Sequence, residues 1–380
     1  NENNNGIKGK SISEEVEKTY YSDFYTTPPP QAGLINRYTS TPSCSVLIES
    51  PEIPARVGNN IFSENYYDND RVIIDDVENL YFKDGDPAND YKINEFNVSQ
   101  MFRKYQNESV RMSKNGGLVI ESNVHEILSL SSIFLLSPNS YSKQMVNVFG
   151  TRFLDEIRQN IIPTQEMTLN LECELKFREA IKKSTKESRE HAKEWLLNEL
   201  TNDQNLEKNL GSVILKGLET LPNDKIRNDP SEITLITNYL DYVMRSIFHD
   251  PEKHVVQWPN TGLNESKLRK FNGRAKQPDF TVSVIHQLQT AATIFVGEVS
   301  PPSQKYNVYK NCSDLIRLGV FMKDCIDSAI DKGADVKIIG FQCVDFIIDF
   351  YMIDLVKGTY FMIHISQVSI PASIKELLFF

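Results

Sequence analysis

The order of apolar patterns after residue 224 is the feature that most constrains the fold. A helical pattern and a short strand come first, two further strand patterns follow, and a second helical pattern precedes three more strands. The expected helices cover residues 233–247 and 313–329, and the expected strands cover residues 255–258, 279–285, 293–299, 336–344, 346–355 and 359–370. Strands interleaved with helices in this way predict an α/β domain in which helices flank a mixed sheet.

The chain divides into three regions of different composition. Residues 1–60 contain an Asn-rich start and a Pro28-Pro29-Pro30 run without periodicity, which predicts a poorly ordered arm. Residues 61–221 are predicted to form an acidic, mainly α-helical region without a catalytic motif, and this region is a candidate surface for a protein partner. Its helix-like spacing lies at residues 124–136, 153–162 and 169–200. Residues 225–380 hold the α/β pattern.

The charge is distributed unevenly. The whole chain has a net charge of −10, yet acidic and basic residues balance after residue 224. All the excess negative charge therefore lies in the first two regions, which argues against indiscriminate nucleic-acid binding by the whole chain. It leaves the α/β region able to bind a polyanion.

The cysteines and the apolar segments bear on the compartment. The five cysteines have no CxxC spacing and are interpreted as reduced thiols, and no Cys/His spacing suits structural zinc. The polar start lacks the apolar segment of a signal peptide, and the longest apolar stretch carries three aspartates. We expect an intracellular protein of the nucleus or cytoplasm that has no membrane partner.

Two carboxylates mark the end of the expected strand pair. Asp279 follows a proline at the start of one strand, and Glu298 and Ser300 share a face of the next strand because side chains alternate. Two adjacent strands would bring Asp279 and Glu298 together, where they repel each other unless a cation separates them. Oxygen ligands of this kind suit Mg²⁺ or Mn²⁺. The alternatives are a turn aspartate and a glutamate at a strand end.

These residues resemble a known family. Pro278-Asp279, an apolar strand and then Glu298-Val299-Ser300 resemble the signature of PD-(D/E)XK nucleases. The runs GRAKQPDF, FVGEVSPPS and LIRLGVFMKDCIDSAI resemble fungal, crinkler-related members of that superfamily, over roughly residues 229–380. The resemblance implies a restriction-endonuclease-like mixed sheet flanked by helices, and a Mg-dependent nuclease, a phosphodiester hydrolase that acts on DNA or RNA.

The resemblance also implies roles for individual residues. Asp279, Glu298 and Ser300 would be catalytic, and the metal ligands would be Asp279, Glu298, the carbonyl of Val299 and Glu232. Glu232 has a second interpretation as the Glu of a capping box, with Asp229 as the N-cap of the first helix.

Ser300 departs from the family, which normally has lysine at that position. A serine hydroxyl can position water but supplies no positive charge, and Lys305 and Lys310 downstream are the candidate replacements. Lys323, on the second expected helix, is a more distant one. The chain is therefore expected to be either a weakened nuclease or a pseudoenzyme. In the second case it would be a catalytically inactive module of nuclease fold that binds nucleic acid or a protein partner.

A basic run precedes the expected strand pair. It holds five cations and no acid within ten residues, namely Lys267, Arg269, Lys270, Arg274 and Lys276. Such a cluster can contact phosphates without reading sequence, which predicts a nucleic-acid-binding loop. The alternative is a solvated loop.

Overall fold

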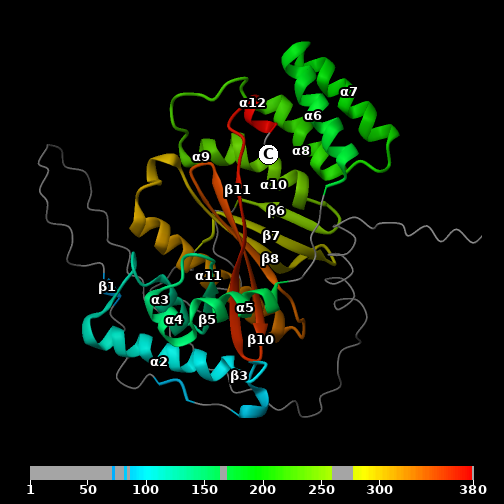
Figure 1. Ribbon diagram of the computed structural model, residues 1–380. Helices are drawn as coiled ribbons and strands as arrows, with labels where there is room; N and C mark the ends of the chain where they lie inside the picture. The colour runs from blue at the N-terminus through cyan, green and yellow to red at the C-terminus, as the bar shows by residue number, and fades with distance from the viewer. Residues whose placement is uncertain (1–70, 73–80, 84–85, 163–168, 259–276, 379–380) are drawn as a thin grey trace, which may run out of the picture.

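A computed structural model describes residues 71–72, 81–83, 86–162, 169–258 and 277–378 (Figure 1). The expected arm at residues 1–60 and the basic run at 267–276 lie outside these residues. Within the described ranges, no helix is long and apolar enough to cross a membrane. Four of the five cysteines are described, and none of these four forms a disulfide.

A seven-stranded mixed sheet forms the centre of the molecule (Figure 1). Its order is β5-β11-β10-β9-β8-β7-β6, in which β8 with β9 and β11 with β5 are parallel and the other neighbours are antiparallel. The strands are β5 Ile133–Leu136, β6 His254–Gln257, β7 Phe280–His286, β8 Gln289–Ser300, β9 Ile338–Val344, β10 Ile347–Val356 and β11 Thr359–Ser369. The six strands predicted after residue 224 are all present, which confirms the mixed sheet.

Helix α11, Val308–Asp331, covers one face of the sheet as the connection from β8 to β9. Its buried Leu318 and Met322 share a core with Val296 of β8 and with Ile338 of β9. Because side chains alternate along β8, Phe295 and Val299 enter the core on the opposite face. At the end of β8, Val296, Glu298 and Ser300 therefore point toward α11.

The opposite face packs against helices that flank the sheet on that side. These are α8 Lys208–Thr220, α9 Glu232–Leu235, the π-helical turn η3 Ile236–Leu240, α10 Asp241–Phe248 and α12 Ile374–Leu377. The sequence predicted one continuous apolar face over residues 233–247. A π turn inserts an extra residue into the helix and rotates the residues before it, so Ile233 is exposed instead of buried.

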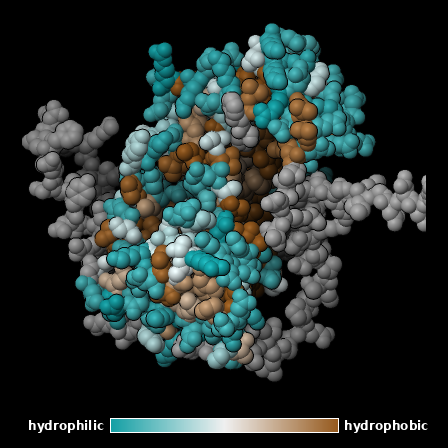
Figure 2. Space-filling view, in the orientation of Figure 1, coloured by the Kyte–Doolittle hydropathy of each residue, from teal (hydrophilic) through white to brown (hydrophobic). Residues whose placement is uncertain are grey.

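The described part of the region 61–221 is mainly helical, as predicted. Its helices are α2 Val98–Gly116, α3 Val124–Leu130, α4 Lys143–Phe149, α5 Thr151–Ile161, α6 Leu171–Lys186 and α7 Arg189–Asn202. The long pattern at 169–200 is split because Ser188 caps a new helix, accepting a hydrogen bond from the amide of His191. The α6–α7 pair presents a largely hydrophilic surface, with apolar residues gathered in the recess beside it (Figure 2).

The remaining short elements are β1 Arg71–Val72, β2 Lys92–Ile93, β3 Phe96–Asn97, β4 Leu118–Val119 and the 3₁₀ turns η2 Pro87–Asn89 and η5 Pro302–Gln304.

One predicted helical segment is wrong. Residues 133–136 fall within an expected helix, but they form β5 and pair in parallel with β11. All four residues of β5 are buried, and a short apolar run of this kind has no periodicity that separates a strand from a helix. One strand of the central sheet thus comes from the region 61–221.

Candidate functional site

The end of β8 places Glu298 and Ser300 under α11. Both residues are 1% exposed, and both face the helix because they are two positions apart on the strand. Gly297, the residue before Glu298, lies under the ring of Phe341, where an added Cβ would come within 2.2 Å of a ring carbon. This close packing holds the end of β8 against β9 and fixes the backbone that carries both side chains.

Asp279 lies beside this strand end, as predicted. Its amide donates to the carbonyl of Gly297 at 3.0 Å, and its Oδ2 accepts from the amide of Val299 at 2.8 Å. Burial raises the pKa of Asp279, while the hydrogen bond from the Val299 amide opposes that rise. The contact therefore uses the amide of Val299, and the expected ligand role of its carbonyl stays a prediction.

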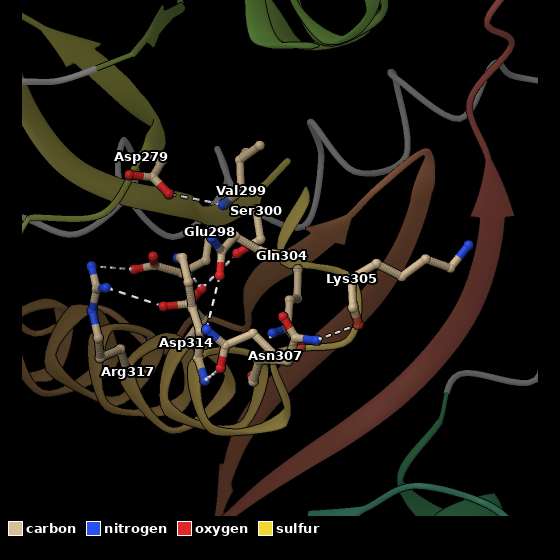
Figure 3. A network of polar contacts seen from close by, with 12 residues as sticks. Asp279, Glu298, Val299, Ser300, Gln304, Lys305, Asn307, Asp314 and Arg317 are labelled. Atoms are coloured by element: carbon tan, nitrogen blue, oxygen red, sulfur yellow. Dashed lines mark hydrogen bonds and ion pairs between the residues drawn. The ribbon is translucent and has the colours of Figure 1, made fainter. Parts of the chain in front are cut away.

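Asp314 of α11 is a central residue of the site that the sequence did not reveal. Its Oδ2 accepts the hydroxyl of Ser300 at 2.9 Å and the ammonium of Lys310 at 2.7 Å. Its Oδ1 accepts from Arg317 Nη1 at 3.2 Å (Figure 3). Lys310, Asp314 and Arg317 share one helix face because they are spaced by four and three residues. This spacing was the available signal.

Arg317 brings a second cation to the buried carboxylates. Its Nη2 lies 3.1 Å from Glu298 Oε1 and donates to the carbonyl of Gln277 at 2.9 Å. No donor among the described residues forms a hydrogen bond to Glu298 Oε1, which is a buried atom. Burial raises the pKa of Glu298 well above its usual range, and the negative charges of Asp279 and Asp314 raise it further. The positive charge of Arg317 lowers the pKa, but not enough to cancel these effects. The carboxylate of Glu298 is thus incompletely compensated.

Glu232 contributes a further negative charge from α9. The residue is exposed overall, but its carboxyl group loses part of its contact with water. This desolvation, together with the negative charge of Asp279, raises the pKa of Glu232. The capping-box interpretation is wrong, because the N-cap is Ser231, whose hydroxyl accepts from the amide of Thr234 at 3.3 Å, and not Asp229. The N-cap lies two residues later than expected, and Glu232 is the first residue of α9.

The candidate replacement lysines lie in different places. Lys310 is in the site, held by Asp314. Lys305 instead pairs with Asp345 at 2.8 Å, and Lys323 pairs with Asp327 at 2.6 Å farther along α11. Of the three, only Lys310 contacts the carboxylate that also binds Ser300.

The donor set can be tested against a divalent cation. Four carboxylates, those of Glu232, Asp279, Glu298 and Asp314, act on one another electrostatically and face the cations of Lys310 and Arg317. When ionised, the cluster has two negative charges in excess, which is the charge that one Mg²⁺ or Mn²⁺ neutralises. Hard oxygen donors also suit these ions. In the described part of the chain, no three His, Cys, Asp or Glu side chains converge in the manner of a metal site.

Comparisons of the chain with protein-family models, with curated proteins and with solved structures each found no match.

Proposed function

We propose that the chain is a metal-dependent phosphodiester hydrolase of restriction-endonuclease-like fold that cleaves DNA or RNA. The fold assignment is supported by the order of β6 to β11 around α11, with one carboxylate before β7 and another near the end of β8. The observation that carries the proposal is the buried carboxylate of Glu298, which lies beside Asp279 and Asp314 and has an oxygen without a hydrogen bond. A buried carboxylate of this kind costs free energy unless a cation compensates it.

In this proposal Asp279 and Glu298 hold Mg²⁺ or Mn²⁺, with Glu232 as an additional carboxylate. The bound ion would lower the pKa of a water molecule and offset negative charge on the phosphodiester. The residues of the chain perform the remaining tasks. Asp279 keeps the start of β7 against the end of β8 through the Val299 amide, which holds the two carboxylates in fixed register.

In this proposal Lys310 takes the role of the lysine that the nuclease family has at the position of Ser300. Its ammonium and the hydroxyl of Ser300 bind the same oxygen of Asp314, at 2.7 and 2.9 Å. The side chain of Lys310 is 32% exposed, so a substrate can approach it while Asp314 keeps it in position. Asp314 is therefore a positioning residue in this scheme. One preorganised positive group of this kind contributes roughly 10²–10³ to the rate.

A second function is favoured by one observation. Arg317 already pairs with both Glu298 and Asp314, which stabilises the cluster without a metal ion. A chain that kept this arrangement permanently would be a binding module of nuclease fold, with nucleic acid or a protein as its partner and no turnover.

Titration with Mn²⁺ in a calorimeter tests the proposal. We expect the parent to bind Mn²⁺ and Asp279→Asn to lose that binding, because the substitution removes a ligand charge from the cluster. Asp354→Asn is the matched control, since it breaks an ion pair with Lys337, at 3.0 Å, outside the cluster. Single- and double-stranded DNA and RNA are then assayed for cleavage with each protein.

The outcomes separate the two functions. Mn²⁺ binding that depends on Asp279, together with Asp279-dependent cleavage of any of the four substrates, supports the hydrolase. Binding of the ion without cleavage favours the binding module. If Asp279→Asn binds Mn²⁺ as well as the parent does, the proposed metal site is abandoned.

A further inference from the structure

We propose that Arg317 is an internal counter-cation that occupies the metal-binding carboxylates and is displaced when a divalent cation binds. The inference rests on the proposed function, and it makes Arg317 the residue that sets the metal affinity of the site. It also explains why an arginine, which is a cation, lies in the middle of a cluster that would hold another cation.

Arg317 contacts three partners, two through hydrogen bonds and one as an ion pair. Nη1 donates to Asp314, while Nη2 donates to the carbonyl of Gln277 and lies beside Glu298 Oε1 without a hydrogen bond to it. An arginine that binds a carboxylate strongly uses two parallel N–H groups on its two oxygens. Glu298 is near the charge of Arg317 but does not form this bidentate pair with it. A divalent cation that binds the carboxylate oxygens directly can therefore replace Arg317.

The net charge of the cluster also favours replacement of Arg317 by a divalent cation. Arg317 and Lys310 leave two negative charges uncompensated when all four carboxylates are ionised. A divalent cation supplies twice the charge of the guanidinium, and it takes carboxylate oxygens as direct ligands. Exchange of Arg317 for the ion therefore improves the compensation of Glu298 and leaves Lys310 with Asp314.

The displaced side chain has a place to go. The side chain of Arg317 is 26% exposed, so its guanidinium is not enclosed by the core. Its Cζ already lies 5.9 Å from the centre of the Phe321 ring, and an aromatic face attracts a guanidinium.

Calorimetric titration with Mn²⁺ compares the parent with Arg317→Gln. A unit positive charge a few ångströms from a divalent ion opposes its binding, so removal of the charge should tighten binding roughly 10- to 100-fold. Arg245→Gln is the matched control, because it removes an arginine that pairs with Asp241, at 2.8 Å, on another helix. The affinity of Arg245→Gln for Mn²⁺ should stay within about twofold of the affinity of the parent, since salt screens distant charges.

Thermal unfolding provides a readout that does not depend on activity. Without metal, Arg317→Gln should unfold at a lower temperature than the parent, because Glu298 loses its ion pair with Arg317. Saturating Mn²⁺ should then raise the unfolding temperature of Arg317→Gln more than that of the parent. A variant that stays unfolded at every Mn²⁺ concentration overturns the inference, because a displaced guanidinium is dispensable once the ion is bound.

The two proposals fail separately. If the parent binds Mn²⁺ through Asp279 and Arg317→Gln binds it with equal or lower affinity, Arg317 is not a competitor, while the metal site stands. If neither protein binds Mn²⁺, both ideas fall. Binding by Arg317→Gln alone supports the counter-cation and shows that the parent is locked against the ion.

Discussion

Glu298→Gln tests whether burial or Arg317 controls the charge of the buried carboxyl group. Burial raises the pKa of Glu298 well above the usual 4.5, and the attraction of Arg317 does not cancel this effect. In the metal-free parent, the folded protein therefore retains a proton on Glu298 to a higher pH than the unfolded chain does. Stability from this group is fully present below pH 4.5, and it is lost as the pH rises toward the folded pKa.

Glutamine cannot ionise, so Glu298→Gln escapes this loss. The difference between the unfolding free energies of the variant and the parent should increase with pH, by at most about 1.4 kcal/mol per pH unit. Between pH 5 and pH 7 the largest possible increase is about 2.7 kcal/mol. No discount for solvent screening applies, because Glu298 is 1% exposed.

Urea unfolding followed by circular dichroism, in the presence of a chelator, measures both proteins at pH 5, 6 and 7. A difference that is flat or decreases with pH would refute the reasoning. In that case Arg317 keeps Glu298 ionised throughout, and burial is the weaker influence.

Three further substitutions examine other parts of the structure. Lys310→Met should lower the rate of Mn²⁺-dependent cleavage roughly 10²–10³-fold in single-turnover assays, and addition of Ser300→Lys should restore part of that rate. Gly297→Ala should destabilise the protein by about 1–3 kcal/mol in urea unfolding, because its Cβ collides with Phe341. Phe134→Ala should cost about 3–5 kcal/mol in the same assay, because the ring is fully buried in β5.

Each of these has a clear contrary result. Full activity of Lys310→Met would remove this lysine from the mechanism, provided that its Mn²⁺ affinity is unchanged. A Gly297→Ala protein as stable as the parent would mean that Phe341 can move aside. If Phe134→Ala loses less than about 1 kcal/mol, β5 contributes little to the sheet.

The strand pair of the candidate site was predictable because its elements are close in sequence. Strands β7 and β8 form a hairpin, so strand periodicity alone places Asp279 beside Glu298 and points Glu298 and Ser300 to one face. Helix α11 was predictable from its apolar spacing. What this spacing does not give is the rotation of α11 over the sheet, which decides which of its polar residues face β8.

Asp314 and Arg317 were missed for that reason. On the sequence they resemble the charged residues of an ordinary helix surface, and the contact with Ser300 depends on packing that includes the close approach of β8 and β9 at Gly297. The choice between Lys305 and Lys310 also required the structure. Lys310 is on the helix one turn before Asp314, whereas Lys305 precedes the helix and contacts Asp345.

The parallel pairing of β5 with β11 has a consequence for synthesis of the chain. Strand β5 emerges from the ribosome long before its partner residues 360–363, and its four residues are buried in the finished sheet. Until the last strands arrive, this segment remains without its backbone hydrogen bonds and is a site for aggregation. Completion of the sheet therefore awaits β11, and expression of residues 225–380 alone would leave the β11 edge open to another chain.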